Sequence, residues 1–537
     1  MKEQDRERAA GRGVDRRTFL KTSAAGIGAA AALGGVALPA APPAAPPAAA
    51  GQKAEPLPGS VPQIAASEVR ETLSADVAVV GLGISGMCAA VTAVEAGAKT
   101  VALEKADLYT ARGFDDGCVN SSVHKDAGVS FDREEMIAEL MRQANYRVDQ
   151  RLIATWVDKS GEAVDWLRAL LEPRGVKASV VKGGDEREGP YKVYHTAVNW
   201  TGQNPRLLAE LEKVLKEKGG DIRYGTPAVQ LLREGAGRVT GVIARRPDGG
   251  YLRVNARKGI ILSTGGYENS PEMMRKYLRP SDLRIERFNS QAKTCTGDGH
   301  NMALAVGADM DEPPHCLIVG NGIVPSKDEF YLVMFTPWLR VDANGRRYVN
   351  EDSDYCRQAN ANAVLPKAFN WSVFDSRWGE GPGSDPKYTA FVKSQLDRYV
   401  KQGHALTADT LGELAKKMQV PAAVFEATVK RYNELADKKK DLDFGVAGDK
   451  MRPLKKAPFF ALQVRNFCLV SVSGLRINEN MQVLDRNGLV IPGLYASGNT
   501  SGGFFSDTYP RNVHGISHGR AITFGRLAAK HAAGAKA

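Results

Sequence analysis

The sequence predicts an α/β fold in which a Rossmann-like domain is interrupted by an inserted α+β capping domain. Three observations favour this fold. A glycine-rich turn joins an apolar strand to a helix within residues 76–104, and glycine turns recur within residues 259–273 and 474–505. Between residues 325 and 456 these turns stop and mixed helices with charged runs replace them. The length of 537 residues allows about three or four domains.

The first fifty residues have the pattern of an export signal. A basic stretch ends at residues 15–21 (DRRTFLK), an apolar run covers residues 24–38, and a segment rich in proline and alanine reaches residue 50. The apolar run is shorter than the roughly 20 residues that a membrane span needs, so we expect no stable span in the mature chain. The lead-in at residues 51–72, rich in proline and small residues, is predicted to be disordered.

The paired Arg16 and Arg17, followed by Thr18-Phe19-Leu20-Lys21, resemble a twin-arginine signal, which a receptor of the export machinery reads. This machinery is therefore an expected partner. We expect the mature protein in the periplasm or at the outer face of the cytoplasmic membrane.

Residues 76–104 read as a strand, a glycine turn, a helix and a second strand. Gly81, Gly83 and Gly86 fit the pattern G-x-G-x-x-G. In this pattern the first glycine permits the tight turn, the second lets the backbone approach a pyrophosphate, and the third lets helix and strand pack closely. Glu104 ends the second strand, where a carboxylate accepts hydrogen bonds from ribose hydroxyls. The unit predicts a dinucleotide and leaves FAD or NAD open.

Further glycine segments follow along the chain. An apolar strand ends at Thr264-Gly265-Gly266, where missing side chains let the backbone lie against a bound ligand. Residues 296–308 begin another glycine turn and helix. Residues 131–174 have helical spacing, and His195, within YKVYHTAVNW, is interpreted as structural. The predicted domains are residues 73–324 and 457–537 for the two parts of the Rossmann-like domain, and 325–456 for the insertion.

Charge and cysteine usage exclude several classes of protein. The net charge is +11, but the basic residues are spread, with no block longer than residues 438–440, so nucleic-acid binding is not expected. The six cysteines never fall in C-x-x-C spacing. A c-type haem attached through the usual motif and a sequence-local zinc or iron–sulfur site are therefore not expected, and we predict no metal.

Five segments in order resemble the fumarate reductase flavoprotein family, which includes flavocytochrome fumarate reductases, urocanate reductase and 3-ketosteroid dehydrogenases. They are DVAVVGLGISG, ILSTGGY, TGDGHNMALAVGA, GRRYVNE and GLYASGN, and the resemblance covers about residues 75–530. It implies FAD as the cofactor. It also implies that Gly498 and Asn499 lie beside the flavin and that the helix beginning near Ser517 points its N–H groups at the ring. The implied FAD-binding residues are Gly81, Gly83, Ser85, Gly86, Glu104, Lys105, Thr264, Gly265, Gly266, Asp298, Gly498, Asn499, Ser517 and Ile522.

The chain departs from this family at the catalytic positions. In fumarate reductases an arginine shortly after the N-E of GRRYVNE delivers the proton. Aligning on Asn350 and Glu351 places Tyr355 there, with Arg357 two residues on. A tyrosine at this place resembles the ketosteroid dehydrogenases. The loop at residues 113–122 contains no histidine for covalent flavin attachment, and whether the flavin is covalently held stays open.

The terminal segment SDTYPRNVHG offers Tyr509, Arg511 and His514 where both subfamilies have substrate contacts, and either Arg511 or Asn512 aligns near the substrate arginine. We therefore predict Tyr355, Arg357, Tyr509, Arg511 and His514 as catalytic residues.

The predicted reaction is reduction of a carbon–carbon double bond activated by a carbonyl or carboxylate. The flavin gives hydride to the β carbon, and a residue of the capping domain gives the proton. Alternatives are a dehydrogenase that introduces a double bond next to a ketone and a non-catalytic flavin electron carrier. No haem or iron–sulfur domain is evident before residue 75, so a separate electron-donor protein, a cytochrome or one linked to quinol, is an expected partner beside the small unsaturated substrate.

Overall fold

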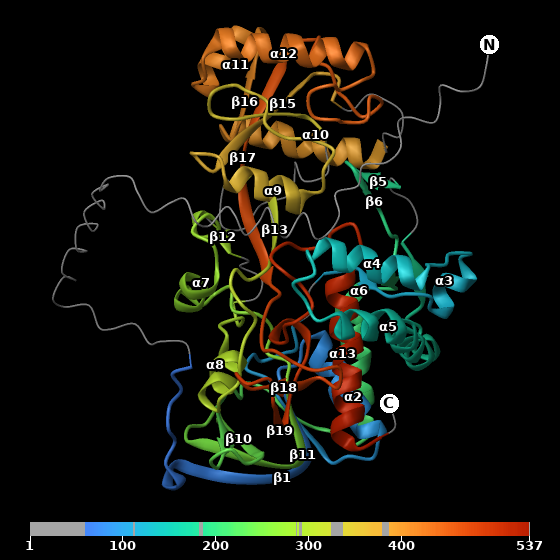
Figure 1. The fold of residues 1–537 in the computed structure, drawn as a ribbon, viewed down its shortest axis with the longest axis vertical. Helices are drawn as coiled ribbons and strands as arrows, with labels where there is room; N and C mark the ends of the chain where they lie inside the picture. The colour runs from blue at the N-terminus through green and yellow to red at the C-terminus, as the bar shows by residue number, and fades with distance from the viewer. Residues whose placement is uncertain are drawn as a thin grey trace, which may run out of the picture. The chain divides into compact units, whose positions relative to one another are not determined.

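The structure, a computed structural model, describes residues 59–110, 113–181, 186–285, 287–288, 293–323, 337–378 and 386–535. The predicted export signal at residues 1–50 lies outside these ranges. All described residues belong to one compact unit, Glu55–Ala537. Figure 1 shows its two large sheets and the helices around them.

The first sheet has eight strands, and its central strands are parallel. Its main path runs β18-β19-β11-β1-β2-β8, and β10 and β9 extend it antiparallel from β11. The strands are β1 (Val69–Val80), β2 (Thr100–Leu103), β8 (Asp221–Arg223), β9 (Ala228–Arg233), β10 (Val239–Arg245), β11 (Tyr251–Leu262), β18 (Gln482–Leu484) and β19 (Val490–Ala496). The last four residues of β1 and the last three of β11 are buried and apolar, as in sheets covered on both faces.

The parallel strands place the glycine segments at one edge. β1, β2, β11 and β19 all end at this edge, and the glycine turn, Glu104, Ser263 and Ser497 directly follow them. In open α/β sheets ligands bind outside the carboxyl ends of the strands. The fold therefore positions a candidate site here.

Two helices with small residues pack closely beside this edge (Figure 1). α2 (Ile84–Glu95) follows the glycine turn, and α13 (Ile516–Ala533) packs against α2. A Cβ at Gly525 would lie 2.3 Å from the Ser85 carbonyl oxygen, so only glycine allows this approach. The other helices of this part are α3 (Ser122–Asp126), α4 (Arg133–Gln143), α5 (Gln150–Leu171), α6 (Gln203–Glu217), α7 (Pro271–Tyr277) and α8 (Asp298–Ala305).

Two small sheets accompany these helices. One consists of β3 (Asp116–Gly117), β7 (Ala197–Trp200) and β4 (Ala178–Val180), and the other of β5 (Arg187–Glu188) and β6 (Tyr191–Lys192). Short 3₁₀ turns are η1 (Ala66–Glu68), η2 (Glu172–Arg174), η3 (Asp282–Arg284) and η5 (Gly498–Thr500).

The second large sheet belongs to the inserted domain and has six strands around β17 (Phe459–Ser471). The others are β12 (Arg287–Phe288), β13 (Leu317–Gly322), β14 (Leu339–Val341), β15 (Phe369–Asp375) and β16 (Ala405–Ala408). Its helices are α9 (Tyr355–Ala363), α10 (Pro386–Lys401), α11 (Leu411–Met418) and α12 (Ala422–Asp437). The insertion has hydrophobic clusters of its own, one around Phe425 and Tyr432.

The sheet of the inserted domain extends beyond the predicted limits of 325–456. β12 and β13 precede residue 325, and β17 follows residue 456, yet all three pair in this sheet. The predicted limits rest on where the glycine-turn motifs stop along the sequence. The strands that lead into and out of the insertion contain no motif that would have extended these limits.

The end of β17 contacts the edge of the first sheet. The Ser471 hydroxyl accepts a hydrogen bond from the Tyr267 backbone amide at 2.8 Å and donates to the Glu268 carboxylate at 3.1 Å. β17 thus connects the capping domain to the segment that follows β11.

The lead-in differs from its prediction over its described part. η1 forms before residue 69, β1 already begins at Val69, and Val61 packs against the core. The Gly59 amide donates to the Asn301 side chain at 2.9 Å. Composition alone did not reveal these contacts, because they are made with distant parts of the chain.

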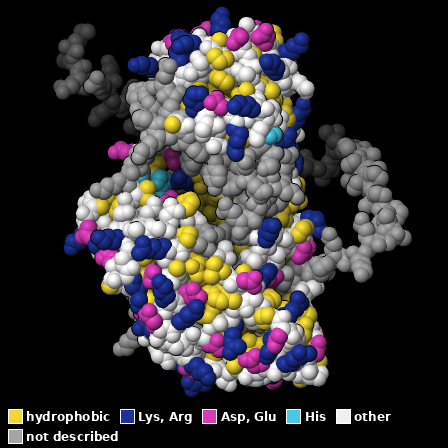
Figure 2. Space-filling model, turned by 180° about the vertical axis from the view of Figure 1, so that it is seen from behind, with side chains coloured by type: hydrophobic (Ala, Val, Ile, Leu, Met, Phe, Trp, Pro, Cys, Tyr) yellow, Lys and Arg dark blue, Asp and Glu magenta, His cyan; other side chains and the backbone are white. Residues whose placement is uncertain are grey.

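Among the described residues, none of the helices has the length and apolar character that crossing a bilayer requires. On the face shown in Figure 2, basic and acidic side chains are interspersed over the described surface.

Candidate active site

A cavity lies at the carboxyl ends of β1, β2, β11 and β19. We call it the cofactor cavity. Its lining comprises Val80, Gly81, Gly83, Ile84, Ser85, Leu103, Glu104, Lys105, Thr110, Ala228, Ser263, Thr264, Gly265, Thr294, Cys295, Asp298, Gly498, Asn499, His518 and Ala521. These residues come from every segment in which the sequence predicted a glycine turn.

Steric contacts explain why two positions of the first turn must be glycine. Gly81 has φ +93°, and a Cβ there would lie 2.4 Å from the Ser263 carbonyl oxygen. A Cβ at Gly86 would lie 1.8 Å from the Gly81 oxygen, so this glycine seats α2 on the turn. Gly83 is different, because the nearest atom to its Cβ would be 3.9 Å away. Its missing side chain leaves the cavity open for a pyrophosphate.

Glu104 is held in place by backbone amides. Its carboxylate accepts hydrogen bonds from Leu82 at 2.7 Å and from Ala106 at 2.9 Å. Burial raises the pKa of Glu104 above its ordinary value, and these amides oppose that effect. Each carboxylate oxygen has a further lone pair, which fits a ribose diol in the cavity.

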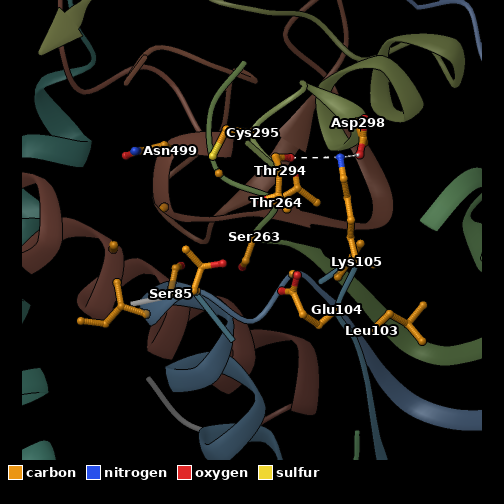
Figure 3. A pocket seen from close by; sticks show the side chains of 18 of the residues that line it. Ser85, Leu103, Glu104, Lys105, Ser263, Thr264, Thr294, Cys295, Asp298 and Asn499 are labelled. Atoms are coloured by element: carbon orange, nitrogen blue, oxygen red, sulfur yellow. Dashed lines mark hydrogen bonds and ion pairs between the residues drawn. The ribbon is translucent and has the colours of Figure 1, made fainter. Parts of the chain in front are cut away.

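Lys105 and Asp298 close the same end of the cavity (Figure 3). The Lys105 ammonium lies 2.8 Å from the Asp298 carboxylate and 2.6 Å from the Thr296 hydroxyl, and it donates to the Thr294 carbonyl at 3.0 Å. Asp298 is the first residue of α8. The structure thus joins two residues that lie far apart in the sequence.

Serine hydroxyls connect three of the segments around the cavity. Ser497 lies within 2.8 Å of both Ser85 and Ser263, which joins the glycine turn, β11 and β19. Gly498 has φ +63°, and a Cβ there would lie 2.9 Å from the Ser85 Cβ. In Figure 3, Asn499 marks the end of the cavity away from Lys105 and Asp298.

Four residues of the predicted FAD-binding set do not line the cavity. Gly86 seats α2, and Gly266 packs against Ser471, where a Cβ would lie 2.3 Å from the Ser471 hydroxyl. Ser517 and Ile522 are buried in α13. Their neighbours His518 and Ala521 line the cavity instead, because a shift of one residue turns a helical side chain by about 100°. The other ten predicted residues line it.

The predicted catalytic residues lie close together at the boundary with the capping domain. Tyr355 is the first residue of α9, and the Arg511 guanidinium lies 5.2 Å from the centre of its ring. The Tyr509 hydroxyl accepts a hydrogen bond from the Ser517 amide at 3.2 Å. We call Tyr355, Tyr509 and Arg511 the tyrosine–arginine cluster. Burial raises the pKa values of both tyrosines well above the ordinary value.

Arg511 is a partly buried cation without a described hydrogen-bond acceptor. Burial lowers the pKa of Arg511, but Tyr355 and Glu188 more than offset this effect and raise it. Arg357 differs, because its guanidinium is hydrogen-bonded to Asp354 and Gln143 and lies 3.7 Å from the centre of the Tyr191 ring. Of these two guanidinium groups, only that of Arg511 has no acceptor among the described residues.

Glu188 and His195 are two further polar residues at this site. The Glu188 carboxylate lies 3.8 Å from His514 Nε2. Burial would raise the pKa of Glu188, but His514 and Arg511 outweigh this and lower it. The His195 ring packs edge-on against His514 at 5.2 Å, and burial lowers the pKa of His195. The sequence prediction missed Glu188, because it lies 326 positions from its partner.

The first turn of α13 connects the cluster with the cofactor cavity. The Ser517 amide contacts Tyr509, while the next side chain, His518, lines the cavity. The tyrosine–arginine cluster and the cavity thus both adjoin the first turn of α13. The glycine cradle, the Glu104 carboxylate and this neighbouring polar site fit FAD, which these residues would hold.

Comparisons with known proteins agree with this site. A vinyl phenol reductase of Lactiplantibacillus plantarum is 26% identical over 495 residues, which cover 86% of this chain and 96% of the relative. A 3-oxosteroid 1-dehydrogenase of Mycolicibacterium smegmatis is 29% identical, covering 66% of each chain. The open conformation of a flavocytochrome c3 fumarate reductase superposes with a TM-score of 0.66 at 25% identity, covering 87% of this chain and 79% of that structure.

The family model described as FAD binding domain matches residues 76–515, most of the chain. The predicted α/β fold, the FAD cofactor and the resemblance to fumarate reductase flavoproteins are therefore confirmed. The chain belongs to this family of FAD-binding proteins and is an FAD-dependent oxidoreductase.

Proposed function

We propose that this protein is an exported reductase of a carbon–carbon double bond conjugated to a carbonyl or carboxylate. The observation that carries the proposal is the Arg511 guanidinium, partly buried and without a described acceptor, beside the Tyr355 ring, in a cluster that adjoins the first turn of α13 as the cofactor cavity does. Bound FAD supplies the hydride that the β carbon of the substrate receives.

Tyr355 supplies the proton to the α carbon. Its raised pKa keeps the phenol protonated at neutral pH, so it is available as an acid. Donation leaves a phenolate, and the Arg511 guanidinium beside the ring stabilises that charge. Proton and hydride together saturate the double bond, and solvent returns a proton to Tyr355.

Arg511 also anchors the carboxylate or carbonyl oxygen of the substrate. A charge-assisted hydrogen bond contributes about 1.5–3 kcal/mol, which favours an acid over its neutral analogue. The Tyr509 hydroxyl accepts from Ser517 and so retains its own proton for the same oxygen. Arg357 acts as a positioning residue, because its hydrogen bonds to Asp354 and Gln143 hold the start of α9 against α4.

A dehydrogenase that introduces a double bond next to a ketone is the second candidate. Two buried phenols beside one guanidinium suit removal of a proton next to a ketone, and a 3-oxosteroid 1-dehydrogenase is among the relatives. A flavin electron carrier without substrate chemistry is not favoured, because the polar cluster adjoins the cavity.

An anaerobic assay separates the candidates. The purified holoenzyme is reduced, and enoates, enones and vinyl phenols are added while flavin absorbance is followed. We expect prompt reoxidation by at least one enoate or enone. Reoxidation by none of these compounds, together with reduction of the oxidised holoenzyme by saturated ketosteroids, contradicts the reductase and supports the dehydrogenase.

We further infer that the protein is exported and receives electrons from a separate cytochrome or quinol-linked donor. The twin-arginine pattern of residues 15–21 supports export, and the flavocytochrome relative supports a cytochrome donor. Replacing Arg16 and Arg17 by lysine is expected to retain the protein in the cytoplasm. Equal amounts of both forms in the periplasmic fraction contradict this route.

A further inference from the structure

A buried arginine of α13 holds the turn η5 from behind the wall of the cofactor cavity. Gly498 and Asn499 of this turn line the cavity. Arg520 is fully buried, and its guanidinium donates hydrogen bonds to the Gly498 carbonyl at 3.0 Å and to the Ser501 carbonyl at 3.3 Å. It also reaches the Asn499 side-chain oxygen at 3.4 Å and the Val472 carbonyl at 3.5 Å. The guanidinium therefore lies one hydrogen bond behind the cavity lining.

Arg520 carries a positive charge although it is buried. Its acceptors are neutral oxygen atoms, and the rings of Phe505 and Phe504 lie 4.6 Å and 5.6 Å from the guanidinium carbon. Burial lowers the pKa of Arg520 to about 10, and the charge of Asp311 opposes this effect. The guanidinium is therefore protonated at neutral pH. A cation held by neutral oxygen atoms is costly to bury, which points to a role in function.

Asp311 is the anion that acts on this cation. Its carboxylate accepts hydrogen bonds from the Gly503 amide at 2.8 Å and from the Gly474 amide at 3.2 Å. Arg520 binds carbonyls of the same two segments, 472–474 and 498–503. Asp311 lines a second cavity together with Arg476, and not the cofactor cavity. The two side chains thus form a dipole, the Arg520–Asp311 dipole, whose positive end adjoins the cofactor cavity.

The wall held by Arg520 lies at the end of the cavity that the nucleotide part of FAD leaves free. Glu104 fits a ribose, and Gly83 leaves room for a pyrophosphate. Asn499 marks the end of the cavity away from Lys105 (Figure 3). This end is left for the ring of FAD. A charge here acts differently on the two redox states, because reduction adds electrons to the ring.

We propose that Arg520 is a positioning residue of the cofactor site, which fixes the wall formed by Gly498 and Asn499 and stabilises reduced FAD relative to oxidised FAD through the positive end of the Arg520–Asp311 dipole. Charges in the protein interior are screened less than charges at the surface, so the dipole acts across the wall. Arg520 and Asp311 bind the same segments with opposite charges. Their removal therefore has opposite effects on the FAD potential, whichever substrate the enzyme reduces.

The test measures the two-electron midpoint potential of FAD in the holoenzyme by reductive titration against reference dyes. The titration is made at pH 8, above the pKa of Asp311, which burial raises to about 6, and below that of Arg520. Arg520→Gln is expected to weaken binding of reduced FAD about tenfold relative to oxidised FAD, which lowers the potential by about 30 mV. Asp311→Asn is expected to strengthen it about threefold, which raises the potential by about 15 mV. This effect is smaller because the contacts of Asp311 lie outside the cavity lining.

Arg526 provides a matched control. It is an arginine of the same helix, its guanidinium carbon lies 4.6 Å from the centre of the Trp166 ring, and it does not line the cavity, so Arg526→Gln is expected to leave the potential unchanged. Arg520→Lys keeps the charge and is expected to change the relative binding less than about twofold.

A purely structural clamp is loosened by either substitution. Shifts of the potential in the same direction in Arg520→Gln and Asp311→Asn therefore overturn the proposal, as does a potential of Arg520→Gln at or above that of the wild type. Should one of these two variants fail to retain FAD, the direction of the shift in the other decides. An Arg520→Lys enzyme with the full drop of Arg520→Gln also contradicts the role of the charge.

Discussion

The Tyr509 hydroxyl accepts a hydrogen bond from the Ser517 backbone amide at 3.2 Å, so the terminal segment is fixed to the first turn of α13. This contact places the tyrosine–arginine cluster next to the helix that lines the cofactor cavity. Tyr509→Phe removes the hydroxyl that accepts from that amide. We expect kcat/KM to fall about 10- to 100-fold and the free energy of unfolding to fall by about 1 kcal/mol. Steady-state kinetics and urea unfolding of the holoenzyme check this, and wild-type kinetics in the variant contradict it.

Tyr355→Phe removes the proposed proton donor and keeps the ring beside Arg511. We expect kcat to fall about 10² or more, because proton transfer in the transition state contributes 10²- to 10⁴-fold. FAD content is expected to remain unchanged, since Tyr355 does not line the cavity. Tyr251→Phe at the opposite end of β11 is the control and should retain full activity. A Tyr355→Phe enzyme with kcat near that of the wild type assigns the proton to another group.

Arg511→Gln removes the proposed anion anchor. Loss of a charge-assisted hydrogen bond of about 1.5–3 kcal/mol lowers kcat/KM by about 10- to 150-fold for carboxylate substrates. For neutral enones kcat/KM is expected to fall less. The exposed Arg257, which pairs with Asp76, serves as control through Arg257→Gln. Equal losses for acids and neutral enones argue against Arg511 as the carboxylate contact.

Gly83 and Gly86 are expected to respond differently to alanine. A Cβ at Gly83 would meet only the Thr110 carbonyl oxygen, at 3.9 Å, so Gly83→Ala is expected to fold normally but to project a methyl group into the path of the pyrophosphate and lose FAD. A Cβ at Gly86 would lie 1.8 Å from the Gly81 oxygen, so Gly86→Ala destabilises the whole domain. Flavin absorbance and circular dichroism after purification distinguish the two. Full FAD occupancy in Gly83→Ala would falsify the assignment of this turn.

Asp441 gives the capping domain a pH-dependent contribution to stability. Its fully buried carboxylate lies 2.7 Å from Arg347, which also pairs with Glu351. Burial alone would raise the pKa of Asp441, but Arg347 and backbone amides lower it to about 2. Because the folded pKa lies below the unfolded value near 4, the contribution is complete above that value and disappears as the pH falls toward 2.

Asp441→Asn is therefore expected to lower the free energy of unfolding by about 2 kcal/mol at neutral pH. The difference from the wild type should narrow as the pH falls below 4. Denaturant unfolding at several pH values tests this. A difference that is constant with pH shows that the carboxylate charge does not stabilise the fold.

The sequence predicted those parts of the site that depend on local pattern. Gly81, Gly83 and Glu104 follow from strand, turn and helix within thirty residues, and the structure places all three at the cavity. Side-chain direction within a helix was less predictable, so Ser517 was proposed where His518 lines the cavity. Which side chain of α13 lines the cavity depends on the residue at which the helix begins, because a shift of one residue changes which side chain points inward.

Pairs formed across long stretches of chain were not predictable from one sequence. Asp116 meets His518 and Glu188 meets His514 only because β3, β5 and the terminal segment converge in the folded chain. Neither carboxylate lies in a motif. The described lead-in was assigned to disorder for the same reason, since its contact with Asn301 is made through tertiary structure.

β17 has a mechanical consequence for the enzyme. Its 13 residues span about 40 Å, starting within the sheet of the capping domain and ending at Ser471 against Tyr267 and Glu268. A tilt of the capping domain therefore acts on a rigid lever whose short end presses on the backbone next to Thr264 and Gly265. We therefore expect that opening of the capping domain and release of FAD are coupled through β17.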